Sequence, residues 1–334
     1  MSELDGHIRG LHHVTVGVDG AQDDVSFVRD LLGLRVIKAT VLFDGERPVY
    51  HLYYGDRAGS AGSVFTTFPW RLHGLTGRKG SGQVKRTVFS APPDAIDWWH
   101  ERLAGACLPI EERFGQPALA FQHPSGLDME IIGAEDAREP WLGDGVDDPD
   151  LALRGMHSVT LSVQDIETMT GFLELLGFRC ADEDGRYRRL VVGDGAPGHV
   201  VDLLHEPNLA PGTWTHAQAL HHHFALQVDT EPAQAAIKER LVGEGYVDVS
   251  EVKDRFYFSS IYVRSPAGVL IEFATRPTPD DPPGSVGWLR DETESELGTR
   301  LQLPPWWEDR REEFVSRLEP ITLSPPVHAG ATTR

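Results

Sequence analysis

The chain contains 334 residues, of which 40% are hydrophobic and 25% charged, and it carries a formal net charge of −20. This composition is ordinary for a globular protein, and the length is sufficient for two domains. The negative charge argues against nucleic acid as a partner, because neutralising phosphates requires clusters of Lys and Arg, and it also argues against anionic membrane surfaces.

The cysteine content, the N-terminal residues and the distribution of apolar residues bear on the expected location of the protein. The two cysteines, Cys107 and Cys180, are too few for a disulfide framework and form no CxxC pair for a thiolate zinc site. The first residues do not combine a basic segment with an apolar one, and no apolar run approaches the ~20 residues that span a bilayer. We therefore expect a cytoplasmic protein.

The first half of the chain predicts two units that each begin with a strand and a helix and continue with further strands. The first unit has a predicted strand at 11–18, a helix at 21–32 and strands at 35–43, 49–54 and 63–68. The second unit has a predicted strand at 84–90, a helix from Pro92 to Leu103 and strands at 118–122 and 128–132.

The second half predicts two more units, at 156–204 and 221–274, with helices at 166–176 and 232–243. The polar segment 144–150 is a predicted linker between the halves. A tail rich in proline, including Pro277, Pro279, Pro282 and Pro283, follows and carries one predicted amphipathic helix at 306–318. Because the Trp306-Trp307 pair is costly to leave in water, we expect the tail to pack against the body.

Duplicated segments support this organisation. Gly10-Leu11-His12-His13-Val14-Thr15-Val16 returns as Gly155-Met156-His157-Ser158-Val159-Thr160-Leu161, and the segment ending at Glu130 returns as the one ending at Glu272. Repeats of this size indicate duplicated supersecondary units. We therefore predict an α+β fold of four tandem βαβββ units with curved mixed sheets: domains at 1–145 and 152–276, each of two units, and a tail at 277–334.

Period-two alternation assigns side chains to the two faces of each predicted strand. His13 lies opposite Val14 and Val16, His223 lies opposite the apolar Phe224, and Glu272 lies between Ile271 and Phe273. If the bulky apolar face packs on helices, the other face lines a concavity. The three polar residues are all on that concave face.

Two imidazoles and one carboxylate on separate strands form a potential facial triad. Such a site leaves about three coordination positions open and suits non-haem Fe(II), with Mn(II) as the usual substitute. A carboxylate at the end of the apolar run 268–271 also needs a cation or several hydrogen-bond donors to offset its burial. We therefore predict that His13, His223 and Glu272 bind a metal.

The equivalent positions in the other two units lack histidine. Ser158 replaces His13, and the basic residues Lys85 and Arg86 lie where a second imidazole would be needed. We therefore expect Glu130 to contact one of these basic residues and not to bind a second metal.

Several motifs, taken together with the duplicated units, resemble the vicinal oxygen chelate superfamily, and within it the ring-cleaving dioxygenases that act on hydroquinones. The resemblance covers nearly the whole chain. It is carried by Leu11-His12-His13, Tyr50-His51-Leu52-Tyr53-Tyr54, Thr66-Thr67-Phe68-Pro69-Trp70, Gly77-Arg78-Lys79-Gly80-Ser81, Arg113-Phe114-Gly115-Gln116, Phe121-Gln122-His123-Pro124, Asp202-Leu203-Leu204-His205-Glu206-Pro207, His222-His223 and Tyr262-Val263-Arg264-Ser265-Pro266.

The resemblance implies the same three metal ligands, His13, His223 and Glu272. It also places Tyr262 and Arg255 near the substrate, as a proton donor or relay and as a group that positions the substrate or stabilises an oxyanion. It places His12 and His222 near the metal, although alternation directs both toward the other face, so we assign them no catalytic role. For His51 and His205 we expect structural roles.

By this resemblance, the expected function is an extradiol-type, Fe(II)-dependent ring-cleaving dioxygenase in aromatic catabolism, with a small aromatic substrate and O2 as partners. Two alternatives stay open: a glyoxalase-type metal-dependent isomerase or lyase, and a non-catalytic binder of small aromatic compounds. The segments at 70–73 and 303–306 differ from the chlorinated-hydroquinone enzymes, so the ring substituents stay undefined. A homo-oligomer is compatible with the sequence.

Overall fold

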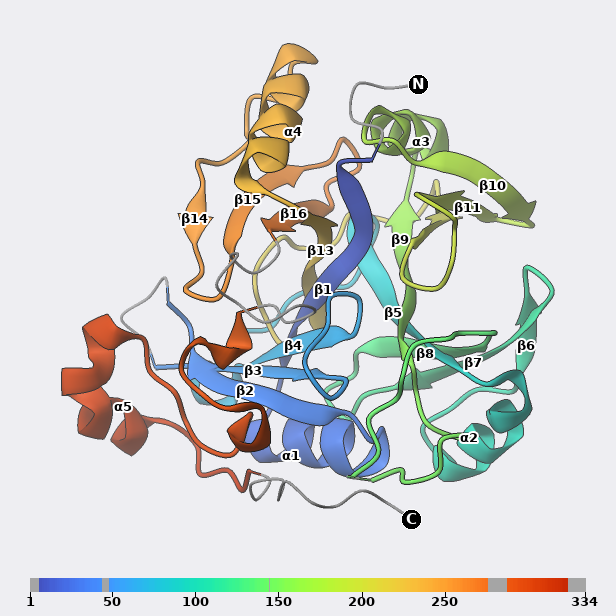
Figure 1. The fold of residues 1–334 in the computed structure, drawn as a ribbon. Coiled ribbons are helices and arrows are strands. Elements are labelled where there is room, and N and C mark those ends of the chain that lie inside the picture. Colours follow the sequence, from blue (N-terminus) through green and yellow to red (C-terminus); the bar gives the residue numbers. More distant parts are fainter. Residues whose placement is uncertain (1–5, 44–47, 144, 276–286, 324–334) are drawn as a thin grey trace.

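The computed structural model describes residues 6–43, 48–143, 145–275 and 287–323, which form two curved eight-stranded sheets (Figure 1). The first sheet contains, in spatial order, β14 (Lys253–Asp254), β15 (Ser259–Arg264), β16 (Leu270–Thr275), β13 (Leu220–Val228), β1 (Ile8–Val18), β4 (Val64–Pro69), β3 (Tyr50–Gly55) and β2 (Arg35–Val41). The second sheet contains β10 (Arg179–Asp184), β11 (Tyr187–Val191), β12 (Val200–His205), β9 (Gly155–Val163), β5 (Gln83–Ala91), β8 (Asp128–Gly133), β7 (Gln116–Gln122) and β6 (Glu111–Arg113).

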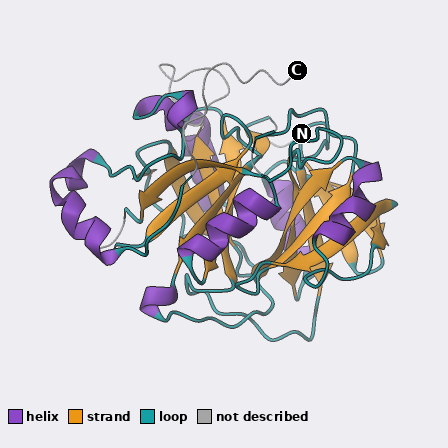
Figure 2. Cartoon of the chain, turned by 90° about the horizontal axis from the view of Figure 1, so that it is seen from below, coloured by secondary structure: helices purple, strands orange, loops and turns teal. Residues whose placement is uncertain are grey.

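The helices lie around the two groups of strands (Figure 2). The main helical segments are α1 (Ala21–Val25), which continues as the π-helix η1 (Ser26–Leu31), α2 (Ile96–Arg102), α3 (Ile166–Leu175), α4 (Glu231–Gly243) and α5 (Arg311–Arg317). Short 3-10 segments are η2 (Arg71–His73), η3 (Pro93–Ala95), η4 (Trp288–Arg290), η5 (Glu294–Glu296) and η6 (Pro305–Arg310). Together with the sheets, they confirm the predicted α+β class and the four βαβββ units. No described helix has the length and apolar character needed to cross a membrane.

The pairing of units differs from the sequence-contiguous domains that we expected at 1–145 and 152–276. The first unit joins the fourth through the antiparallel pair β1–β13, and the second joins the third through β5–β9. In each unit the first strand lies at an edge, where its backbone groups would otherwise lack partners. Pairing these edges gives each sheet one unit from each half of the chain.

The tail packs on the body, as expected from the Trp306-Trp307 pair. Trp307 packs against the buried cluster of Val41, Leu303 and Phe314, and the ring centroid of Trp306 lies 5.9 Å from those of Phe43 and Phe256. Trp288, Leu303 and Phe314 are buried, whereas the side chain of Trp306 is about half exposed. The predicted helix at 306–318 is present as η6 followed by α5. The prolines from Pro277 to Pro283 and the linker residue Asp144 lie outside the described residues.

Two phenylalanines link the sheets. Phe65 in β4 and Phe89 in β5 are fully buried, and their rings meet edge to face with centroids 6.0 Å apart. They belong to one large apolar core that also includes bulky apolar residues of β9 and β13 that lie on the opposite face from Ser158 and His223. Aromatic pairs in this geometry contribute about 0.5–1.5 kcal/mol beyond the burial of their area.

We expect the substitution Phe89→Ala to lower the free energy of unfolding by about 3–5 kcal/mol, because it leaves a cavity between the sheets. Denaturant titration would measure this loss, and a double-mutant cycle with Phe65→Ala should give a coupling of about 0.5–1.5 kcal/mol. Leu72→Ala, at an exposed position, is the control and should change stability by less than about 0.5 kcal/mol. A loss for Phe89→Ala as small as that of the control would contradict the assigned packing.

Candidate metal centre

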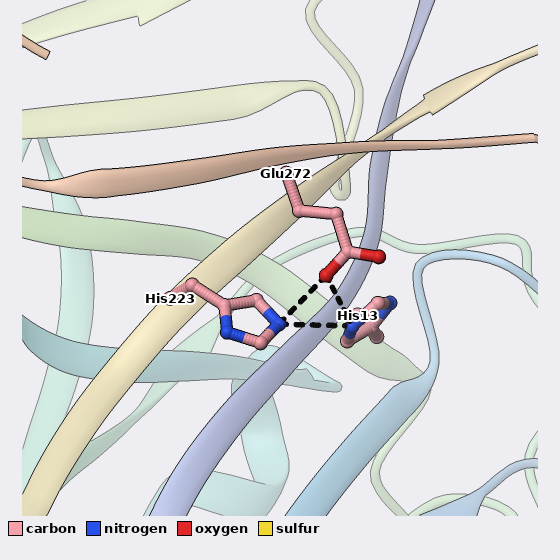
Figure 3. Close-up of side chains that lie close together, drawn as sticks. All are labelled: His13, His223 and Glu272. Atoms are coloured by element: carbon pink, nitrogen blue, oxygen red, sulfur yellow. Dashed lines mark hydrogen bonds and ion pairs between the residues drawn. The ribbon is translucent and has the colours of Figure 1, made fainter. Parts of the chain in front are cut away.

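Three neighbouring strands of the first sheet direct His13, His223 and Glu272 toward one point (Figure 3). His13 of β1 pairs with Ala225 of β13, and Ala225 pairs with Glu272 of β16. The small Ala225 side chain leaves space between the two ligand candidates. His223 lies two residues before Ala225, on the same face of its strand. The predicted concave face therefore brings all three side chains together.

The ligand atoms are close enough to share one cation. His223 Nε2 lies 2.8 Å and His13 Nε2 lies 3.4 Å from Glu272 Oε2, and the two imidazole nitrogens are 3.3 Å apart. All three residues are buried. Among the described residues, they are the one group of His, Cys, Asp and Glu with converging ligand atoms. Two imidazole nitrogens and one carboxylate oxygen fit the donor set of a facial triad.

Electrostatics favour the ligating forms of two of these residues. Burial by itself raises the pKa of the Glu272 carboxyl, but His13 and His223 outweigh burial and hold this pKa well below its usual range. The pKa of His223 is lowered, mainly by burial and against the influence of Glu272. The site thus combines an ionised carboxylate with an imidazole that burial keeps neutral, which is the state that binds a metal.

Each histidine of the cluster contacts the histidine that precedes it. The Nδ1 atoms of His12 and His13 are 2.8 Å apart, and the Nδ1 atoms of His222 and His223 are also 2.8 Å apart. Burial lowers the pKa values of His12 and His222 to about 3. Although alternation directs these rings toward the other face, their Nδ1 atoms still reach the ligands. Such a hydrogen bond fixes the tautomer that leaves Nε2 free for a metal.

Tyr262 and Arg255 lie beside the cluster and contact each other. Tyr262 of β15 pairs with Glu272, and its ring lies 5.7 Å from that of His223. Arg255 Nε donates a hydrogen bond of 3.1 Å to Tyr262 Oη, with the guanidinium 5.3 Å from the ring centroid. Burial, followed by the charge of Glu272, raises the pKa of Tyr262 above its usual value. The phenol is therefore protonated and can donate a hydrogen bond.

Further polar residues lie near the cluster, and two of them, Ser260 and His216, were not identified from the sequence. Ser260 Oγ donates to Glu272 Oε1. Ser260 lies on the same face of β15 as Tyr262, so alternation could have found it. His51 contacts Thr66 Oγ1 through Nε2 at 3.1 Å and Tyr53 Oη through Nδ1 at 2.8 Å. His216, which stacks on His222 at 4.2 Å, lies outside the strands, where no periodicity could place it.

His205 ends β12 in the second sheet, away from the strands that carry the cluster. The expected structural role of His51 stays a prediction. Its hydrogen bonds to Thr66 and Tyr53 fit a structural side chain, but they also hold it on the concave face of the first sheet, where it lies near the candidate metal centre.

The second sheet holds the equivalent positions without a metal-binding set. Ser158 pairs with Val88 and Val88 pairs with Glu130, as His13, Ala225 and Glu272 do in the first sheet. Arg86 takes the place of His223. Its Nη1 lies 3.3 Å from Glu130 Oε2, and Arg113 Nη1 lies 2.7 Å from both oxygens of that carboxylate. The expected contact of Glu130 with a basic residue is therefore confirmed for Arg86, and Arg113 adds a second one.

Known proteins resemble this chain over most of its length. The model of the Glyoxalase/Bleomycin resistance protein/Dioxygenase superfamily matches residues 155–273. The chain is 37% identical over 331 residues to the chlorohydroquinone/hydroquinone 1,2-dioxygenase of Sphingobium indicum, and the alignment covers 97% of this chain and 100% of that protein. It is 34% identical over 314 residues to MhqE of Bacillus subtilis, named as a candidate ring-cleaving dioxygenase, which covers 92% of this chain and 98% of that protein.

Two solved structures have similar folds. A crystal structure from Bacillus subtilis, described as a candidate dioxygenase, has a TM-score of 0.84 and 32% sequence identity, covering 94% of this chain and 97% of that one. Glyoxalase I from Zea mays has a TM-score of 0.61 and 13% identity, covering 80% of this chain and 92% of that one. At this identity the second likeness concerns the fold alone.

The histidine beside Ser158 generates a prediction on pH and stability. Burial, helped by Arg189 and Arg138, lowers the pKa of His157 from 6.5 to about 3. Between these pH values the unfolded chain binds a proton that the folded protein excludes, so stability falls as the pH falls from about 6.5 to 3. One such group contributes a slope of up to about 1.4 kcal/mol per pH unit.

We therefore expect His157→Gln to flatten the decline in the free energy of unfolding between pH 6 and 4 by up to about 1.4 kcal/mol per pH unit. Urea titrations over this range would measure the slope. His100→Gln, at an exposed position, is the control for the loss of a histidine. The same slope for parent and His157→Gln would contradict the prediction.

Proposed function

Because the chain belongs to the ring-cleaving dioxygenases of the Glyoxalase/Bleomycin resistance protein/Dioxygenase superfamily, we propose that it opens the ring of a hydroquinone or related phenol with O2. In this proposal His13, His223 and Glu272 hold Fe(II), with Mn(II) as a substitute. The convergence of their ligand atoms in one buried cluster is the observation that carries the proposal.

The donor set fits this metal and this chemistry. Two imidazole nitrogens and one carboxylate oxygen leave about three positions for other ligands. A metal ion bound there would lower the pKa of a phenolic hydroxyl and bring the ring and O2 together. Ser260, His12 and His222 would keep the three ligands oriented, because each contacts one of them directly. Such supporting hydrogen bonds commonly change metal affinity by about 10–100-fold.

Tyr262 and Arg255 would handle protons and charge. The raised pKa of Tyr262 keeps its hydroxyl protonated, so that Tyr262 can donate a hydrogen bond or a proton to an oxygen that develops negative charge. Arg255 holds Tyr262 Oη through Nε. Its positive charge would also stabilise an anionic oxygen in this partly buried place. Because Tyr262 pairs with Glu272, both groups would act next to the metal ligands.

The glyoxalase-type alternative has less support. Such isomerases and lyases usually need a second carboxylate among the metal ligands. The candidate for it, Glu130, lies in the second sheet, where Arg86 and Arg113 neutralise it. The likeness to maize glyoxalase I concerns the fold alone. The third possibility, a binder without catalysis, is separated from the dioxygenase by the experiment below.

The test is metal binding together with oxygen uptake. Anaerobically purified protein should take up one Fe(II) per chain and then consume O2 when a hydroquinone is added. His223→Ala should keep its far-ultraviolet circular dichroism spectrum, bind Fe(II) at least about 100-fold more weakly and lose O2 uptake, because a ligand contributes more than its supporting partners. His205→Ala, a histidine outside the cluster, is the matched control and should behave like the parent.

Full iron loading without O2 uptake on any hydroquinone would remove the dioxygenase proposal. If that protein still bound phenols, it would be a binder without catalysis. Normal iron affinity in His223→Ala would remove the proposed metal site instead.

We expect Tyr262→Phe to lower kcat by about 10²–10⁴-fold, the usual contribution of a general acid or base, while iron content stays at the parent level. Steady-state O2 uptake and metal analysis on the same sample would measure both. Tyr246→Phe, at a half-exposed position after α4, is the control and should keep the parent kcat. A kcat for Tyr262→Phe within twofold of the parent would contradict the assigned role.

A further inference from the structure

The C-terminal strap, which we define as residues 287–303, places Trp288 on the concave side of the first sheet. Trp288 is fully buried. Its ring centroid lies 4.8 Å from that of Tyr53, 5.1 Å from that of Tyr257 and 6.0 Å from that of Phe258. Together with Ala225 and Ala274 from the strands that carry two of the metal ligands, these residues form one apolar cluster. The strap thus contributes an aromatic side chain to the sheet that holds the metal centre.

The backbone around the Trp288 indole is shaped to accommodate this side chain. Its Nε1 donates a hydrogen bond of 3.0 Å to the carbonyl of Gly59. Gly59 has φ of +67°, and a Cβ there would lie 2.5 Å from the indole Nε1. Gly298 of the strap has φ of +70°, and a Cβ there would lie 2.0 Å from Val36 O in β2. Both positions require glycine because of the left-handed backbone and the close approach.

A buried ion-pair group anchors the strap. Lys38 of β2 is fully buried, and its Nζ donates to Asp291 Oδ1 at 2.6 Å, to Trp288 O at 3.1 Å and to Glu292 Oε2. Tyr257 Oη donates to the other oxygen of Asp291 at 3.0 Å. Both anionic partners of this ammonium come from the strap. Lifting the strap would leave a buried charge unpaired, which is strongly unfavourable.

Phe258 and Tyr53, which both pack against Trp288, also contact histidines at or beside the metal centre. The ring of Phe258 lies 5.5 Å from that of His13 and 5.0 Å from that of His12. Tyr53 Oη contacts His51 Nδ1 at 2.8 Å, and burial, modified by the charges of Arg255 and Glu272, raises the pKa of Tyr53 above its usual value. Tyr53 and Phe258 therefore each contact both Trp288 and a histidine of this concave face.

We propose that Trp288 is a positioning residue that sets the depth of this concavity, and thereby the largest ring substituent that the site accepts. The proposal rests on the proposed function, since it concerns the substrate of the same centre. Trp288 acts through Tyr53 and Phe258. A smaller side chain at position 288 leaves space into which these two aromatic rings can withdraw, so a bulkier substrate ring fits beside the metal ligands.

The test compares Trp288→Leu with the conservative Trp288→Phe and with Phe314→Leu. Phe314 is an equally buried aromatic residue of the tail that packs on Val41 and Leu303, in a cluster separate from that of Trp288. Calorimetry under anaerobic conditions on the Fe(II)-loaded proteins would measure the Kd of hydroquinone and of 2-tert-butylhydroquinone. Oxygen uptake would give kcat and KM for the same two compounds.

We expect Trp288→Leu to shift the ratio of the two Kd values by at least about tenfold in favour of the tert-butyl compound, because small volume changes in an apolar pocket alter discrimination by about 10–200-fold. The shift should appear in KM, with kcat for hydroquinone within about twofold of the parent, because the ligands themselves are untouched. Trp288→Phe should shift the ratio in the same direction by less, and Phe314→Leu should leave it unchanged.

A parent-like Kd ratio in folded Trp288→Leu would overturn the proposal, and so would an equal shift in Phe314→Leu, which would indicate general loosening of the tail. If Trp288→Leu fails to fold, a parent-like ratio in Trp288→Phe overturns it equally. Failure of the proposed function is recognised separately, because the Fe(II)-loaded parent protein itself would then show no O2 uptake with either hydroquinone.

Discussion

The antiparallel pairing of β1 with β13 is the interaction on which the candidate site depends. These strands are about 210 residues apart in the chain, and their pairing brings His13 within 3.3 Å of His223. The parallel pair β13–β16 then adds Glu272. Every contact among these three side chains joins two different strands, so no local segment of the chain contains one. If the first and fourth units did not share a sheet, the ligands would be distributed over separate structures.

The second sheet shows how the same scaffold works without a metal. Its buried carboxylate, Glu130, faces the same cost of burial as Glu272, and its pKa is raised by that burial in spite of the nearby guanidinium groups. Arg86 and Arg113 supply the positive charge that a cation would supply in the first sheet. The buried carboxylate of the second sheet thus has positively charged partners, and that of the first sheet belongs to a candidate metal-binding set, as the cost of burying an isolated charge predicts.

The tail completes the first sheet, although it belongs to none of the four units. Its Trp288 belongs to one buried apolar cluster with Ala225 and Ala274, and its Asp291 and Glu292 neutralise Lys38. Tyr53 and Phe258 contact both this tryptophan and histidines at or beside the candidate metal centre. Three sets of residues thus build the candidate site: the candidate ligands on the central strands, the aromatic residues Tyr53 and Phe258, and the strap that packs against them.

The sequence by itself determined the four units, the resemblance to the ring-cleaving dioxygenases and the face on which His13, His223 and Glu272 lie. It could do so because side chains alternate strictly along a strand, and because duplicated segments reveal which residues were exchanged. It also predicted that Glu130 has a basic partner. These conclusions depend only on residues that are near one another in the chain or in equivalent positions of a repeat.

Only the tertiary structure decided which units share a sheet. The first unit joins the fourth and the second joins the third, so the expected domains at 1–145 and 152–276 do not coincide with the sheets. The tertiary structure alone showed the Nδ1 contacts of His12 and His222, the second partner of Glu130 and the position of Trp288. Alternation describes the faces of one strand, but it carries no information on which edge strand will pair with it. The docking of a distant segment depends on the shape and charge of a surface that exists only after the sheets have formed.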